Sequence, residues 1–273
     1  MLKQRVLTAA VLVPGFLLAL FFSSPGVWMA LMGIATVLAS WEWARMAGFA
    51  TPGRWGYTIL VAILLLSDSL FGVGAVSQPL IWGAVLVFWL VLVPLWLGLH
   101  WMLRQRYWLA FVGLALLAPT WLALVALRET SPWLLFFLMG LVWVADIAAY
   151  VFGRTWGKHK LAPRISPGKT WEGAAGALLC GVFYTLLWQA LAPQALAHFK
   201  GFSTLGLIFM TLFMVAISIM GDLFESYMKR SAGLKDSGNL IPGHGGILDR
   251  IDSQTSVLPV AFAGLYFSAR WIN

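Results

Sequence analysis

Residues 132–152 read PWLLFFLMGLVWVADIAAYVF, and this stretch decides what kind of fold the chain can form. It contains one charged side chain, Asp146, in a run as long as the roughly 20 apolar residues needed to cross a bilayer core. Because lipid cannot hydrogen-bond to the backbone, such a run must be helical. The stretch therefore predicts a membrane-spanning helix with a carboxylate about two turns from one end.

Similar apolar runs occupy most of the chain. Hydrophobic residues make up 61% of the 273 positions and charged residues 10%, too few to cover a soluble domain. We predict an all-α polytopic membrane protein, with spans 1–5 in residues 1–128 and spans 6–9 in residues 129–273 of one integral unit. The nine predicted spans are residues 6–23, 27–48, 56–74, 79–100, 108–127, 132–152, 173–192, 203–224 and 254–271.

The distribution of cations predicts the orientation, because cytoplasmic loops are enriched in Lys and Arg. With the N-terminus inside, fifteen of the eighteen Lys and Arg residues fall on the cytoplasmic side, and Arg128, Lys200 and Arg270 fall on the other. This favours an N-in, C-out topology. The net charge of +8 then gathers at one membrane face, where it would attract anionic lipid; no soluble basic domain is present to bind nucleic acid.

The first apolar run is interpreted as a retained span, because it lacks a small-residue cleavage site before Ser23. With no organelle-targeting extension ahead of it, we expect a multi-pass protein of a bacterial inner membrane.

Two segments on the predicted cytoplasmic side are richer in polar residues than the rest: residues 153–172 and residues 225–253. Seven of the ten acidic residues lie in or beside them. Acidic groups inside a span are costly and usually face a partner or a wet cavity. We therefore expect Asp146 and Asp222 to lie at a similar shallow depth near these two segments.

The segment 225–253 combines cations with carboxylates. Asp249 and Asp252 are three positions apart, and paired carboxylates suit Mg²⁺, which takes one or two of them together with water and substrate phosphates. Lys229, Arg230, Lys235 and Arg250 supply cations suited to phosphate. This density predicts metal-assisted phosphoryl or nucleotidyl transfer. His244, flanked by glycines, is interpreted as a hydrogen-bond donor to phosphate or as a group that orients another residue.

The segment 153–172 contains Gly168-Lys169-Thr170, which looks like the end of a P-loop. The motif fails because position 163 is proline where its first glycine would stand, and no strand precedes it. A basic loop whose Lys169 could reach phosphate remains.

The run from Ser226 to Asp252 resembles, position by position, the signature of phosphatidate cytidylyltransferases, also called CDP-diacylglycerol synthases. The resemblance extends to residues 166–173, to Gly221-Asp222 and to Trp41-Glu42-Trp43. One departure is Ile147, which follows Asp146 where the family often has a small hydroxyl residue.

This resemblance implies the reaction of CTP with phosphatidic acid to give CDP-diacylglycerol and pyrophosphate, with Mg²⁺ as the cofactor. A second ion and a homodimer are compatible with it. Asp249 and Asp222 are the implied metal ligands. The implied catalytic residues are Asp249, Asp222, Lys229, Arg230, His244 and Arg250. The implied substrate-binding residues are Lys235, Lys169, Ser226, Asp236, Asp252 and Asp146.

Three other functions are compatible with parts of the pattern. A transporter or channel would place its charges near the midplane and on several helices, whereas here they gather at one face. A CTP-dependent lipid kinase would share the site but phosphorylate an alcohol. A CDP-alcohol phosphatidyltransferase is disfavoured because its D-G-x2-A-R motif is absent.

Overall fold

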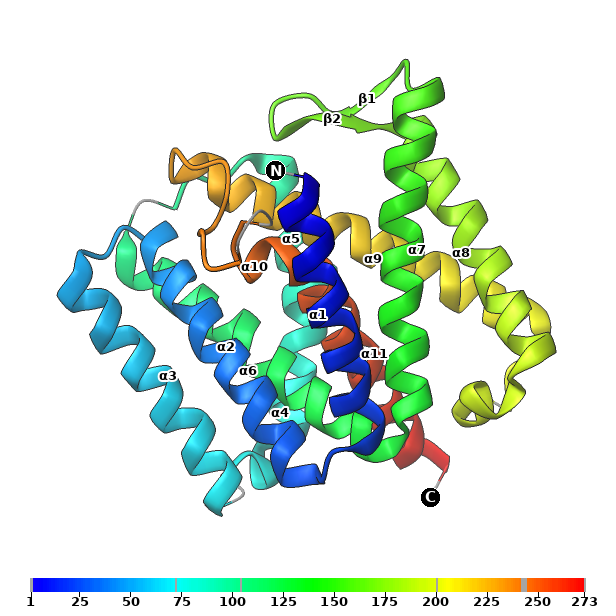
Figure 1. The fold of residues 1–273 in the computed structure, drawn as a ribbon, viewed down its shortest axis with the longest axis horizontal. Coiled ribbons are helices and arrows are strands. Elements are labelled where there is room, and N and C mark those ends of the chain that lie inside the picture. The colour runs from blue at the N-terminus through cyan, green and yellow to red at the C-terminus, as the bar shows by residue number, and fades with distance from the viewer. Residues whose placement is uncertain (1, 72, 104, 200, 242–244, 273) are drawn as a thin grey trace.

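A computed structural model describes residues 2–71, 73–103, 105–199, 201–241 and 245–272. Nearly all of this chain is helical (Figure 1). The elements are α1 (Leu2–Phe22), α2 (Pro25–Met46), α3 (Thr51–Phe71), α4 (Val73–Val87), the π-helix η1 (Phe88–Leu92), α5 (Val93–Leu99), α6 (Arg106–Thr130), α7 (Pro132–Trp156), β1 (Lys160–Ala162), β2 (Ser166–Thr170), α8 (Trp171–Leu191), the 3₁₀-helix η2 (Pro193–Phe199), α9 (Thr204–Ser231), α10 (Leu248–Ile251) and α11 (Gln254–Ile272).

The described residues of the predicted spans fall on helical segments, apart from shifts of a few residues at the ends. Within these residues, six helices are long and apolar enough to cross a membrane: 25–46, 78–99, 106–130, 132–156, 171–191 and 204–231. The chain is therefore a helical, polytopic membrane protein. The full count of nine spans stays a prediction.

Serine and threonine residues determine where several of the helices begin. Ser24, Ser131, Thr170 and Ser203 each stand before the first turn of a helix, and each side-chain oxygen accepts a hydrogen bond from a backbone amide in that turn. Ser24 and Ser131 are followed by proline, whose missing N–H costs nothing at the first helical position.

Both polar segments contain regular secondary structure rather than loops alone. Residues 160–170 form an antiparallel hairpin of β1 and β2, a small exception to the predicted all-α fold. Helix α9 continues past Asp222 to Ser231 and ends where Gly233 adopts a φ of +70°. There the amide of Leu234 donates to the carbonyl of Lys229 at 2.8 Å, as in a Schellman motif. Ser226, Lys229 and Arg230 are therefore helical residues.

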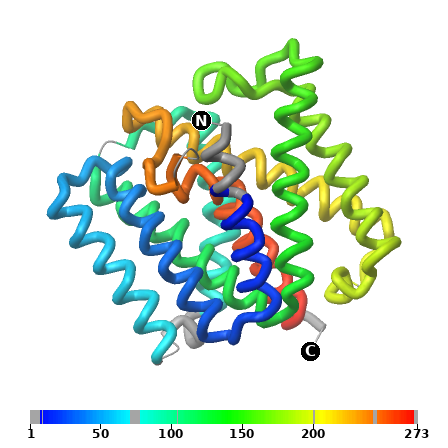
Figure 2. The backbone as a smooth tube through the Cα atoms, in the orientation of Figure 1, coloured from blue at the N-terminus to red at the C-terminus, as the bar shows by residue number. Residues whose placement is uncertain are grey.

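Helices α7 and α8 run side by side from the hairpin and pack more closely than most pairs (Figure 2). Glycines allow this approach: Gly176 lies against the ring of Phe152, and Gly140 against the hydroxyl of Tyr184. The hairpin and the segment after α9 lie at one end of the bundle, and α11 runs from there toward the other end (Figure 1).

Helix α9 connects this pair to the rest of the bundle, since it packs against α8, α11 and α5. Its Phe224 is fully buried within edge-to-face contacts of Phe88, Trp89 and Trp96, which come from η1 and α5. This packing fixes the part of α9 that carries Asp222 and Glu225.

Candidate functional site

A cavity of about 660 Å³ lies among α7, the hairpin, α8, α9 and the segment 249–252. Its apolar lining includes Ala145, Ala149, Leu161 and Ile219. Its charged lining consists of four carboxylates and two cations: Asp146, Asp222, Asp249, Asp252, Arg154 and Lys169. The cavity therefore unites the two polar segments that the sequence singled out.

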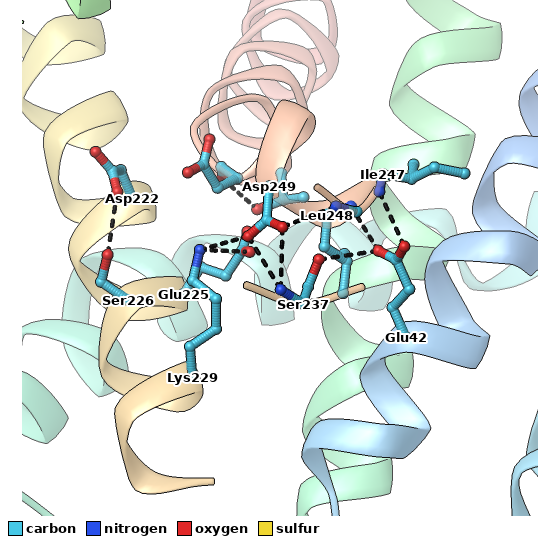
Figure 3. A network of polar contacts seen from close by, with 12 residues as sticks. Glu42, Asp222, Glu225, Ser226, Lys229, Ser237, Ile247, Leu248 and Asp249 are labelled. Carbon is cyan, nitrogen blue, oxygen red and sulfur yellow. Dashed lines mark hydrogen bonds and ion pairs between the residues drawn. The ribbon is translucent and has the colours of Figure 1, made fainter. Parts of the chain in front are cut away.

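Asp249 is the most firmly held of these carboxylates (Figure 3). Its Oδ1 accepts a hydrogen bond from Lys229 Nζ at 2.8 Å, and its Oδ2 accepts the amides of Ser237 at 3.0 Å and Gly246 at 2.9 Å. Burial opposes its charge, but these donors prevail and lower the pKa of Asp249 below its usual range. Asp249 therefore presents an ionised carboxylate in a fixed orientation.

Lys229 lies between two acids rather than in the open cavity. Besides Asp249, its ammonium group contacts Glu225 Oε1 at 3.2 Å, one helical turn away on α9. The lysine side chain is 11% exposed and that of Glu225 4%. The charge of Lys229 is thus shared by two buried carboxylates.

Asp252 is in the opposite electrostatic situation. Burial raises the pKa of Asp252 well above its usual range. Repulsion acts in the same direction and comes from the carboxylates of Glu225, Asp222 and Asp146. The described donors to this part of the wall belong to Ser253, whose amide is 2.8 Å from Asp252 Oδ1 and whose hydroxyl is 3.5 Å from Asp146 Oδ1. This wall of the cavity holds excess negative charge.

Two cations also line the cavity, one from the hairpin and one from α7. Lys169 on β2 forms an ion pair with Asp222 at 2.5 Å, and Asp222 also accepts a hydrogen bond from Ser226 at 3.3 Å. Arg154 on α7 donates to the hydroxyl of Tyr150 at 2.6 Å. Cations and carboxylates that line one cavity suit a phosphate-bearing ligand that arrives with a metal ion.

The hairpin holds Lys169 in this position. Thr170, the next residue, caps α8 by accepting the amide of Gly173 at 3.1 Å. Glu172 accepts hydrogen bonds from the ring and amide of His159, the ring contact being 2.7 Å. These contacts fasten both ends of the hairpin to the start of α8.

The remaining predicted site residues lie elsewhere. Four have exposed side chains and are not among the residues that line the cavity: Arg230, Lys235, Asp236 and Arg250. His244 falls outside the described residues, so its predicted role has no structural counterpart here.

Two residues beyond the sequence predictions belong to this region. Arg154 lines the cavity, although the sequence suggested only a topological role for it. Glu42 of α2 is 2% exposed, and its carboxylate accepts the amides of Ile247 and Leu248 (Figure 3). A signal existed for Glu42, because an acid within a span usually has a partner.

The donor set fits a magnesium ion. Asp222 and Asp249 reach one cavity from different elements, and hydrogen bonds to a ligating carboxylate are a normal feature of metal sites. Among the residues that the structure describes, no three or more His, Cys, Asp or Glu side chains are grouped so that they could hold a metal ion by themselves. A site of this kind suits an ion that keeps water and substrate phosphate as further ligands.

Comparison with known proteins extends over nearly the whole chain. A sequence model of the cytidylyltransferase family matches residues 3–268. A phosphatidate cytidylyltransferase of Pseudomonas aeruginosa is 42% identical, covering 99% of both chains. Proteins of the same name from Haemophilus influenzae and Brucella suis are 35% and 37% identical, covering 98% and 92% of this chain and 99% and 88% of their own lengths.

Proposed function

Because this chain belongs to the cytidylyltransferase family, we propose that it transfers CMP from CTP to phosphatidic acid, forming CDP-diacylglycerol and releasing pyrophosphate. The observation that supports this most is that four carboxylates, Lys169 and Arg154 line one cavity. Relatives that span the same length are named for this activity.

In the proposed reaction, a phosphate oxygen of phosphatidic acid attacks the α-phosphorus of CTP. The new P–O bond forms as the bond from the α-phosphorus to the bridging oxygen of the leaving pyrophosphate breaks. A phosphate nucleophile is already ionised, so no general base is required. Lys169 and Arg154 bind the phosphates and neutralise the charge that develops on the leaving group.

Asp222 and Asp249 would hold Mg²⁺, and Asp146 and Asp252 would lie beside it. The ion, when bound, supplies charge stabilisation at the α-phosphate and the leaving pyrophosphate. Lys229 acts one step away, since it orients Asp249. Participation of a second ion stays a prediction from the family resemblance.

We place the cavity on the cytoplasmic side of a bacterial inner membrane, where CTP is available, with nine spans and an N-in, C-out orientation. The bias of cations toward this side supports the orientation. Labelling of single cysteines introduced in the hairpin and beyond α11, in a variant lacking Cys180, would test it in intact cells and in inverted vesicles. Homodimer formation also stays a prediction.

The decisive assay supplies purified protein with Mg²⁺, phosphatidic acid and CTP labelled in the cytosine ring. We expect labelled CDP-diacylglycerol and one pyrophosphate for each lipid product. Asp222→Asn and Asp249→Asn should abolish both products, while Glu129→Gln, at an exposed position of α6, should retain them. Each variant also removes an ion-pair partner, that of Lys169 for Asp222 and that of buried Lys229 for Asp249.

Two results would contradict the assignment. Folded wild-type protein that makes no labelled lipid would overturn the function. Transfer of the γ-phosphate of CTP to a lipid alcohol, with CDP as the second product, would indicate the kinase alternative instead.

A further inference from the structure

Glu42 lies on α2, far from the cavity residues in the sequence. Its carboxylate contacts two short segments that lie between Asp222 and Asp249 in the chain. Oε1 accepts the amide of Ile247 at 3.1 Å, and Oε2 accepts the amide of Leu248 and the hydroxyl of Ser237, both at 3.0 Å. We call these three contacts the Glu42 latch. They join α2 to positions 195 to 206 residues later in the chain (Figure 3).

The surroundings leave room for this carboxylate and little else. Gly238 and Gly246 lie directly against it, and a Cβ added at either position would overlap its oxygens. Helix α2 is itself fixed, because Trp43 donates to the carbonyl of Leu109 on α6 at 2.7 Å. The latch therefore connects Ser237 and the residues at the start of α10 to a rigid part of the bundle.

The latch and Asp249 hold the same two short segments. Ser237 donates its hydroxyl to Glu42 and its amide to Asp249. The amide of Gly246 donates to Asp249, and the next amide, that of Ile247, donates to Glu42. A shift of either segment away from α2 would also withdraw a donor from Asp249.

We propose that Glu42 is a positioning residue for the reaction: it fixes the two backbone segments whose amides orient Asp249 at the cavity. This inference rests on the proposed function for the chemistry of the cavity, while the contacts themselves do not depend on it. Buried amides without an acceptor carry a full desolvation cost, so the segments should move to find other partners when the latch is lost.

Glu42→Gln tests the proposal, because glutamine keeps the size of the side chain but turns an amino group toward backbone donors. Loss of a group that orients a metal-binding carboxylate typically costs about 10- to 100-fold in activity. We expect kcat to fall by that factor, while KM for CTP changes less than about 3-fold because Lys169 and Arg154 are untouched.

The direct readout is hydrogen–deuterium exchange without substrate or metal. In Glu42→Gln, the amides of residues 245–250 should exchange about 10-fold faster, whereas helices α7 and α8 should keep wild-type rates. The matched control is Glu129→Gln, which removes a carboxylate from an exposed position and should change neither exchange nor kcat. If Glu42→Gln does not fold, Ser237→Ala removes a single latch contact and should show the same pattern at about 3-fold.

A merely structural role predicts that the folded fraction of Glu42→Gln keeps wild-type kcat and wild-type exchange at residues 245–250, and that result would overturn the proposal. Failure of the proposed function is distinguishable: wild-type protein would make no CDP-diacylglycerol, while the exchange experiment would still report on the latch.

Discussion

Two groups of carboxylates meet at the cavity, and they differ in how well their charges are neutralised. In the held group, Glu42, Glu225 and Asp249 are buried or nearly so and take hydrogen bonds or an ion pair from Lys229, Ser237 and backbone amides. In the open group, Ser253 donates hydrogen bonds to Asp146 and Asp252. Asp222 forms an ion pair with Lys169 of the hairpin.

The difference separates Glu42 and Glu225, which folding alone explains, from acids available to a ligand; Asp249 is held firmly and also lines the cavity. A buried charge without a partner is costly, so satisfied acids can be explained by folding alone. Acids that repel one another on a cavity wall are not explained in that way, and such arrangements concentrate at functional sites. The open group, together with Asp249 on the same cavity wall, is therefore where a cation and phosphates are expected to bind.

The largest effect is expected from breaking the held group. Lys229→Met leaves Glu225 and Asp249 buried without their shared cation, so the free energy of unfolding should fall by about 3–5 kcal/mol and activity should be lost. Thermal unfolding followed by tryptophan fluorescence in detergent would measure it, with exposed Lys158→Met as the control. Unchanged stability would mean that the two acids are neutral or hydrated.

The next effect separates the two groups by opposite responses. Asp252→Asn removes a repelling charge, so the melting temperature should stay the same or rise, while the rate of CDP-diacylglycerol formation falls about 100-fold. Both quantities can be measured on one preparation. A lower melting temperature with activity preserved would assign Asp252 to the held group.

A smaller effect is expected on the cation side of the open group. Lys169→Met should raise KM for CTP about 10-fold, because a charge-assisted contact to phosphate is lost. Lys160→Met changes the other strand of the same hairpin at an exposed position and should leave KM within about 2-fold of wild type. Equal effects of the two variants would indicate that the hairpin acts through its overall charge.

The smallest effect is expected at the contact that fastens the hairpin. His159 is 78% exposed, so its pairing with Glu172 is screened by solvent. Glu172→Gln should leave the melting temperature nearly unchanged and change KM for CTP by less than about 3-fold. A larger rise in KM would show that the hairpin depends on this contact to place Lys169.

Much of the site could be anticipated from local pattern. Asp146 and Asp222 were expected at a similar shallow depth because an acid in a span usually faces a partner or a wet cavity, and the structure places both on the cavity wall. Lys169 was expected to reach phosphate, and it lines the same cavity, where it pairs with Asp222. Lys229 and Arg230 were expected in a loop because they belong to a segment rich in polar residues. Helix α9 instead continues past them, until Gly233 permits the left-handed turn.

Arg154 and Glu42 could not be assigned in the same way. A cation near a span end has an ordinary explanation in topology, so sequence alone does not distinguish Arg154 from its neighbours. Glu42 has partners about 200 positions away, and nothing in a linear pattern indicates which backbone amides will face it.

The sequence by itself determined the solvent, the helical spans and the family, because hydropathy sums over adjacent residues and lipid forces each apolar run to satisfy its own backbone. Only the tertiary structure decided which acids are held and which are open. That distinction depends on which donors the folded chain brings to each acid, since a buried carboxylate is stabilised by the particular donors within hydrogen-bonding distance rather than by its own identity.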